Sequence, residues 1–168
     1  MTYYGHRFDT PLGNMVSAVD TANNLVLLTF ADKPDIVERL AQELKSSDIV
    51  IDPEKNAHVE EQVGAYFRGE IQTFTLRLKP VGTEFQQSVW RELQYIPYGQ
   101  STTYGEIAKT LGNPKASRAV GRANATNPIA IVIPCHRVIG SSGKLTGYAF
   151  GLNRKEKLLD HERDTKPE

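Results

Sequence analysis

The chain has 168 residues, 39% of them hydrophobic, and its 20 Lys and Arg balance its 20 Asp and Glu. This length allows one ordinary globular domain or two small ones. The aliphatic runs are far shorter than the roughly 18 residues of a membrane span, and the N-terminus lacks a secretory signal, so we expect a soluble, cytoplasmic protein with no membrane partner.

The first half of the chain alternates between strand and helix patterns. Strands are predicted at residues 3–9, 15–20 and 25–30, joined by turns as a meander. Apolar residues four apart predict amphipathic helices at 35–44 and around 59–67. Alternating apolar and polar residues then predict a strand with one buried face at 71–78.

The second half is predominantly helical. The break at Lys79-Pro80-Val81-Gly82 predicts a boundary between a domain of residues 1–80 and a domain of residues 81–168. Helices are predicted from an N-cap at Thr83, from a capping box at Thr103 to Glu106, and from Asn113-Pro114 to Ala125. The last two are short and separated by three residues, which is typical of a helix-turn-helix.

Charge is unevenly distributed along the neutral chain. Residues 1–80 hold eight Lys and Arg against twelve Asp and Glu, a net charge of −4, and residues 81–168 hold the reverse, +4. No acidic residue occurs between Glu106 and Glu156. Neutrality argues against a protein that binds polyanions over its whole surface, but the acid-free interval predicts a local polyanion site.

The third predicted helix of the second half is basic on one side. Lys115, Arg118 and Arg122 are spaced by three and four residues, and Ala119 and Ala123 keep the opposite side slim. An ordinary solvated basic face is the alternative interpretation. The acid-free context favours contact with nucleic acid.

The apolar run Ile129 to Ile133 predicts a buried strand or extended segment, which leads into Pro134-Cys135-His136-Arg137-Val138. A final charged helix is predicted at 153–163. Cys135 is the only cysteine and the four histidines are scattered, so we expect neither an internal disulfide nor a metal site.

A lone buried cysteine is most often an inert small hydrophobic residue. A thiol with a pKa near 8.5 becomes a nucleophile only beside positive charge or a base. His136 and Arg137 supply both types of group if the chain turns here. The plain alternatives are a structural role for His136 and a surface ion pair for Glu162.

Together, these residues resemble the O6-alkylguanine-DNA alkyltransferases, also called methylated-DNA–protein-cysteine methyltransferases. The motif at 134–138 coincides with Tyr104, Arg118, Asn127 and Glu162 at family-like spacing. The resemblance covers nearly all of residues 83–162 and, more loosely, the first half. It implies an α/β protein with a ribonuclease H-like N-terminal domain and a winged helix-turn-helix domain that holds the cysteine.

The resemblance implies DNA repair by direct, irreversible transfer of an alkyl group from guanine O6 to Cys135, with O4-alkylthymine as a second candidate substrate. His136 activates the thiol through a water molecule and Glu162 orients His136. Tyr104 assists the leaving guanine. The thioether product has no carbonyl for water to attack, so each molecule reacts once. The implied partner is double-stranded DNA, bound by a monomer without a cofactor.

The resemblance also assigns residues to DNA and to the base. Arg118 fills the space of the flipped-out nucleotide, and the same helix contacts DNA through Lys115, Ala119, Arg122 and Ala123. Asn127 braces the turn at the nucleophile, and the guanine pocket is lined by Val138, Tyr148 and Ala149. Ala149 and Phe150 replace a serine and a glycine of some members, which predicts a pocket less open to bulky adducts.

Three other functions compete with repair. A damage-recognition protein without transfer activity is disfavoured because the reactive cysteine is intact. A hydrolase that uses Cys135 and His136 would turn over repeatedly on an ester or amide. A helix-turn-helix transcription factor leaves the motif at 134–138 without a role.

Overall fold

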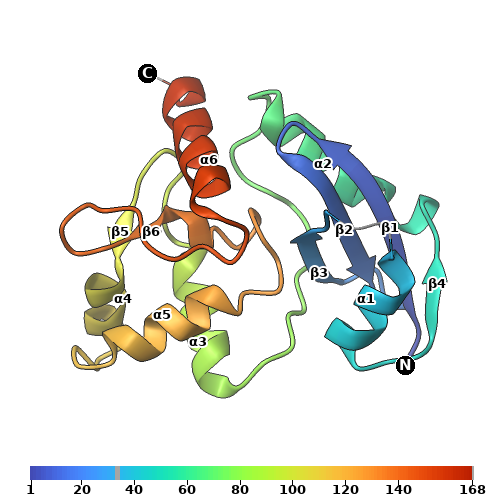
Figure 1. Ribbon diagram of the computed structural model, residues 1–168, viewed down its shortest axis with the longest axis horizontal. Coiled ribbons are helices and arrows are strands. Elements are labelled where there is room, and N and C mark those ends of the chain that lie inside the picture. The colour runs from blue at the N-terminus through green and yellow to red at the C-terminus, as the bar shows by residue number, and fades with distance from the viewer. Residues whose placement is uncertain (33–34, 168) are drawn as a thin grey trace. The chain divides into compact units, whose positions relative to one another are not determined.

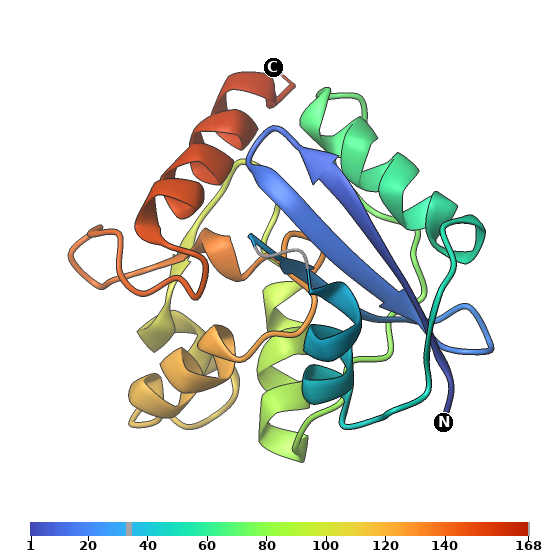
Figure 2. The same cartoon turned by 45° about the vertical axis from the view of Figure 1, so that its right-hand side comes forward.

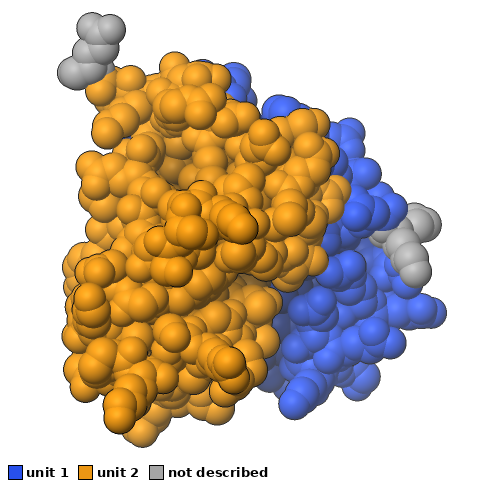
Figure 3. Space-filling view, turned by 60° about the vertical axis from the view of Figure 1, so that its left-hand side comes forward, with its two compact units in different colours: residues 1–81 blue, residues 82–168 orange. Residues whose placement is uncertain are grey.

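The structure is a computed structural model that describes residues 1–32 and 35–167. The chain divides into two compact units, Met1–Val81 (unit 1) and Gly82–Glu168 (unit 2), which Figure 3 shows in different colours. Strands dominate unit 1 and helices dominate unit 2, so the protein is of the mixed α/β class. No helix within the described ranges is long and apolar enough to cross a membrane.

Unit 1 is built on a four-stranded sheet in the order β3-β2-β1-β4. Its strands are β1 (Tyr3–Thr10), β2 (Gly13–Val19), β3 (Leu25–Phe30) and β4 (Ile49–Ile51). The first three pair antiparallel, which confirms the predicted meander, whereas β4 pairs parallel with β1. Sequence analysis missed β4, because three apolar residues are too few to show a period.

Two helices, α1 (Ile36–Leu44) and α2 (Ala57–Phe67), cover opposite faces of this sheet (Figures 1 and 2). Leu40 of α1 packs with Val16 and Ala18. A β-carbon at Gly5 would lie 2.3 Å from Leu40 Cδ1, so the close approach of α1 to β1 requires glycine. On the other face, Ser17 Oγ donates to Oδ1 of Asn56, in the 3₁₀ turn η1 (Glu54–Asn56) before α2.

The predicted strand at 71–78 is wrong. Only Leu78 forms a bridge, parallel to Leu25, and the backbone N–H of Thr75 donates to Gln62 Oε1 instead of to a strand. The alternation of apolar and polar residues describes a chain lying along α2 and β3 with alternate side chains turned inward. Side-chain hydrogen bonds replace a regular ladder there.

Unit 2 contains α3 (Glu84–Leu93), α4 (Tyr104–Thr110), α5 (Ser117–Ala125) and α6 (Leu152–Thr165). Two short strands, β5 (Thr102–Thr103) and β6 (Val138–Ile139), pair in parallel, and the 3₁₀ turn η2 (Cys135–Arg137) precedes β6. Thr83 caps α3 as predicted, and it does so in a capping box with Gln86. Thr103 caps α4 by accepting from Glu106 N, without the reciprocal bond of the capping box predicted there.

The start of α5 differs from the prediction. The backbone N–H of Ala116 donates to Asn113 O at 3.0 Å, which closes a turn, and the helix begins only at Ser117. Asn113 and Pro114 therefore form part of the connection after α4, and Lys115 lies before α5. Asn-Pro is as typical of a turn as of a helix start, so the sequence pattern did not separate the two.

Candidate active site

Cys135 follows a segment of consecutive tight turns: residues 129–133, predicted as a buried strand or an extended segment, are largely buried but form no named strand. The backbone N–H of Val132 donates to Ala130 O at 2.8 Å, and Ile131 between them has φ 71°, a strained conformation for a β-branched residue. Pro134, with φ −80° and ψ 65°, centres a second such turn, in which Cys135 N donates to Ile133 O at 2.7 Å. The apolar run reflects burial, which a coiled segment needs as much as a strand does.

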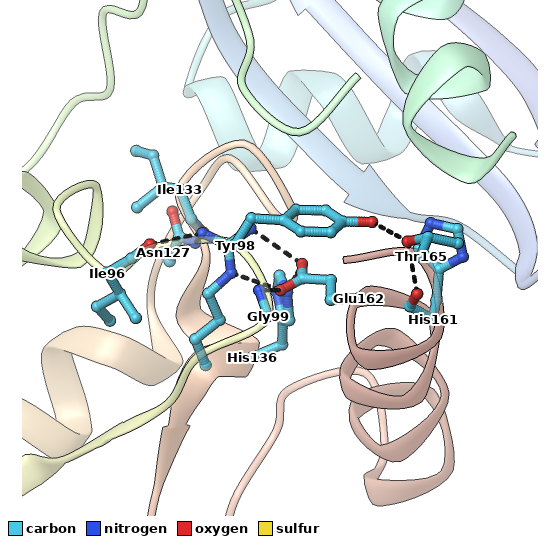
Figure 4. Close-up of polar contacts among 10 residues, drawn as sticks. Ile96, Tyr98, Gly99, Asn127, Ile133, His136, His161, Glu162 and Thr165 are labelled. Carbon is cyan, nitrogen blue, oxygen red and sulfur yellow. Dashed lines mark hydrogen bonds and ion pairs between the residues drawn. The ribbon is translucent and has the colours of Figure 1, made fainter. Parts of the chain in front are cut away.

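Asn127 holds this segment together through its buried amide (Figure 4). Its Nδ2 donates to Ile133 O at 2.7 Å and to Ile129 O at 3.2 Å, and its Oδ1 accepts from Ile129 N at 3.0 Å. Ile133 O also accepts from Cys135 N, so the Asn127 side chain holds the carbonyl group that in turn holds the backbone of Cys135. These bonds join residues 127, 129 and 133, which lie directly before Cys135 in the chain.

Two residues that sequence analysis did not assign to the site also hold this turn. Asn124 Nδ2, on α5, donates to Cys135 O at 3.3 Å. Lys155 Nζ, on α6, donates to Val138 O at 2.5 Å and to Thr146 O at 2.6 Å. Lys155 lies one turn before Leu158 and two turns before Glu162, so the three residues share one buried face of α6.

His136 and Glu162 form a fully buried pair, with Nε2 and Oε2 2.6 Å apart (Figure 4). The second oxygen, Oε1, accepts from Gly99 N at 3.2 Å and from Arg137 Nε at 2.7 Å. The alternative of a surface ion pair for Glu162 is therefore wrong. Three segments distant in sequence, the loop at 99, η2 and α6, meet at one carboxylate.

The environment fixes the ionisation of this pair. Burial alone would raise the pKa of Glu162, but hydrogen bonds and charge from His136 and Arg137 hold it below its usual range. Burial lowers the pKa of His136 and outweighs the opposing effect of Glu162. Nδ1 of His136 is buried and has no hydrogen-bond partner among the described residues. A neutral histidine with one unused nitrogen is suited to accept a proton.

The thiol itself is not activated in advance. Cys135 is 3% exposed, and burial raises the pKa of its thiol to about 11 despite a hydrogen bond with Asn127 and the charge of Lys155. The expectation that Arg137 supplies charge to the thiol is wrong, because its guanidinium binds Glu162. Any activation must accompany the reaction, with a base taking the proton.

The remaining predicted site residues lie around this centre with different exposures. Val138 is fully buried, Tyr148 is half-buried with its hydroxyl enclosed and, within the described chain, unpartnered, and Ala149 is exposed. Thr146 Oγ1 lies 3.5 Å from Tyr104 Oη. A β-carbon at Gly121 would lie 3.9 Å from the Tyr104 ring, so Tyr104 lies along α5.

The basic face of α5 is exposed at Arg118 and Arg122, and Ala119 is half-buried between them. Ala123 is 3% exposed and faces the core, so its predicted contact with DNA is wrong. The carbonyl of Ala123 accepts the indole N–H of Trp90 at 2.9 Å, which anchors α5 to α3. Helical periodicity correctly predicts that Ala119 and Ala123 share one side of α5, but it does not predict how deeply each residue is buried.

These features define a protein with a single, buried cysteine that precedes a buried histidine–glutamate pair. Residues 84–164 match the family model for the DNA binding domain of 6-O-methylguanine DNA methyltransferase. A methylated-DNA–protein-cysteine methyltransferase of Methanosarcina acetivorans is 67% identical over 98 residues, which cover 58% of this chain and 63% of that protein. One of Mycolicibacterium paratuberculosis is 59% identical over 115 residues, covering 68% and 70%.

Solved structures extend the likeness to both units. The O6-methylguanine methyltransferase of Mycobacterium tuberculosis has a TM-score of 0.87 and 42% identity, covering 99% of this chain and 96% of its own. The same organism's protein in complex with DNA has a TM-score of 0.85 and 41% identity, covering 98% and 95%. The chain belongs to the methylated-DNA–protein-cysteine methyltransferase family.

Proposed function

We propose that this protein repairs alkylated DNA by moving an alkyl group from guanine O6 to Cys135 in one irreversible turnover. The observation that carries the proposal is the sole cysteine, held in a turn by the buried amide of Asn127 and followed directly by a histidine whose buried Nδ1 has no partner among the described residues. The M. tuberculosis relative crystallised with DNA supports DNA as the partner. O4-alkylthymine is a second substrate to test.

The chemistry balances without a cofactor. Sγ of Cys135 attacks the alkyl carbon, the S–C bond forms and the C–O6 bond breaks, with its electron pair passing to the purine. The thiol proton moves to His136 Nδ1 through a water molecule and finally replaces the alkyl group on guanine. The thioether that remains cannot be hydrolysed like an acyl-enzyme, so the protein is consumed.

In this proposal, Tyr104 protonates or hydrogen-bonds the leaving guanine. Thr146 is positioned to donate to Tyr104 Oη, which leaves the phenol hydrogen for the base. Tyr148, Ala149 and the backbone of Val138 complete the guanine pocket. Ala149 provides a backbone N–H where a serine of some relatives adds a hydroxyl.

On the DNA side, the proposal requires base flipping, because O6 lies inside the stacked duplex. We infer that α4 and α5 act as a helix-turn-helix within a winged domain, with Arg122 and Lys115 on phosphates and Arg118 in the space of the flipped base. The parallel β1–β4 pair added to an antiparallel meander fits the ribonuclease H-like arrangement for unit 1.

Intact-mass spectrometry tests the reaction directly. Incubation with a duplex containing O6-methylguanine should add one methyl group per chain and no more, and Cys135→Ser should gain none. Repeated turnover on the duplex, or a methyl group on another residue, would refute the proposal. Gel filtration tests the monomer that one complete site per chain implies.

A further inference from the structure

Arg137 is buried against the same carboxylate as His136, with every edge of its guanidinium engaged. Its Nε lies 2.7 Å from Glu162 Oε1, Nη2 lies 3.0 Å from Glu162 Oε2, and Nη1 donates to Ile96 O at 2.7 Å. The face of the group lies over the Tyr98 ring, 5.6 Å from its centroid. This bidentate geometry fixes the carboxylate in direction as well as in charge.

We propose that Arg137 is a positioning residue of the alkyl-transfer reaction: it keeps Glu162 ionised and oriented, so that His136 carries its hydrogen on Nε2 and offers Nδ1 as the proton acceptor. The inference rests on the proposed function, because it concerns the base of that reaction. Arg137 itself contacts neither the thiol nor the DNA in this scheme.

The hydrogen-bond inventory of Glu162 supports this assignment. An ionised carboxylate can only accept, so the hydrogen in its 2.6 Å contact with His136 Nε2 belongs to the histidine. A neutral imidazole has one such hydrogen, which leaves a lone pair on Nδ1. The lowered pKa of Glu162 and the lowered pKa of His136 are consistent with this state, and Arg137 contributes to both.

Without the guanidinium, the pair should take up a proton at higher pH, since a buried cation no longer repels it. If the proton is on His136, Nδ1 becomes a donor. If the proton is on Glu162, the acid donates to Nε2 and the imidazole hydrogen moves to Nδ1. Both arrangements remove the acceptor, so the loss of Arg137 must raise the pH below which transfer fails.

Other ionisable groups lie near the pair, and the Arg137 substitutions leave their identities unchanged. Lys155 lies on the same helix as Glu162, and its charge also disfavours the charged form of His136. Tyr98 lies in the loop after α3 and Cys135 precedes His136 in η2, while Tyr148 and Arg154 lie in and after the loop at 148. A shift specific to Arg137 variants is therefore not explained by these groups.

The test is the single-turnover rate of methyl transfer from an O6-methylguanine duplex between pH 5.5 and 9. Arg137→Met should move the acid limb up by at least about one pH unit, so that its rate falls about tenfold further at pH 6 than at pH 8.5. Arg137→Lys keeps the positive charge but not the two parallel hydrogen bonds to Glu162, so its rate should fall at the same low pH as the wild-type rate while remaining lower than the wild-type rate at every pH. The control is Arg163→Met, which removes an exposed cation of α6 and should leave the profile unchanged.

An acid limb in Arg137→Met equal to that of the wild type, whatever the fall in rate, would show that Arg137 is only structural. If that variant does not fold, ¹⁵N-resolved NMR of the wild-type imidazole decides, and a hydrogen on Nδ1 at pH 7.5 would overturn the proposal. This measurement needs no substrate. A wild-type protein that transfers no methyl group would instead refute the proposed function, whichever tautomer is found.

Discussion

Replacing Asn127 by alanine should destabilise unit 2 strongly, although the substitution removes only a small buried amide. Three hydrogen bonds to the backbone are lost, in addition to the bond with the Cys135 thiol: two from Nδ2 to Ile129 O and Ile133 O, and one from Ile129 N to Oδ1. Ile133 O keeps its bond from Cys135 N, but Ile129 N loses a partner in a buried segment. The unsatisfied Ile129 N–H costs about 1–3 kcal/mol and the two lost bonds from Nδ2 about 1 kcal/mol each, which together predict a loss of about 3–5 kcal/mol.

The only tryptophan gives the assay its specificity. Trp90 is buried in unit 2 and bonded to Ala123 O, so its fluorescence during urea unfolding reports on the unit that contains Asn127. Asn113→Ala removes an exposed asparagine of the same unit and should change stability by less than about 0.5 kcal/mol. An Asn127→Ala midpoint equal to that of the wild type would mean that these three bonds do not hold the turn.

Three further outcomes are expected. Burial lowers the pKa of His136 in the folded state, so the unfolded chain binds a proton at higher pH and the free energy of unfolding should fall as the pH drops below about 6.5. In urea titrations, His136→Gln should reduce this loss of stability between pH 7 and 5. An unchanged dependence of stability on pH would contradict the burial argument. Arg118→Ala should slow repair more than it weakens binding to undamaged duplex. Lys115→Ala should mainly weaken binding and reduce its salt dependence. If rate and affinity measurements show instead that Arg118→Ala mainly weakens binding, Arg118 does not replace the flipped base. The Phe150 ring packs edge-on against the Tyr148 ring, with the ring centroids 5.3 Å apart. Phe150→Gly should therefore raise the transfer rate from O6-benzylguanine relative to that from O6-methylguanine. An unchanged ratio of the two rates would show that this ring does not limit adduct size.

Periodic segments were predicted correctly because a helix or strand with one buried face repeats its pattern. The meander from β1 to β3 and helices α1, α2 and α3 follow from apolar spacing, and Thr83 and Thr103 were recognised as caps. The errors lie where the backbone is satisfied by other means. Segment 71–78 uses a side chain of α2, and Ile129 to Ile133 uses the amide of Asn127.

The candidate site was only partly visible in the sequence. Cys135, His136 and Glu162 could be named from the resemblance, and the structure brings His136 and Glu162 into contact. The burial of Arg137 and Lys155 was not predicted, because charged residues are ordinarily exposed and are stable in the interior only when partners satisfy their charge and hydrogen bonds. Those partners are a carboxylate and backbone carbonyls from distant segments, which no local pattern encodes.

A thiol that stays protonated in the folded protein should react slowly with electrophiles other than the proposed substrate. With the pKa of Cys135 raised to about 11, only about one molecule in ten thousand carries a thiolate at pH 7. Small electrophiles such as iodoacetamide, which need the thiolate, should therefore label the native protein far more slowly than the urea-unfolded protein at that pH. In the proposed reaction, the purine takes the electron pair of the broken C–O6 bond while His136 takes the thiol proton, so the thiol reacts only when substrate and base are both present. Equal labelling rates for native and unfolded protein at pH 7 would show that the folded thiol is as accessible and as ionised as a free one, which would contradict the pKa raised by burial.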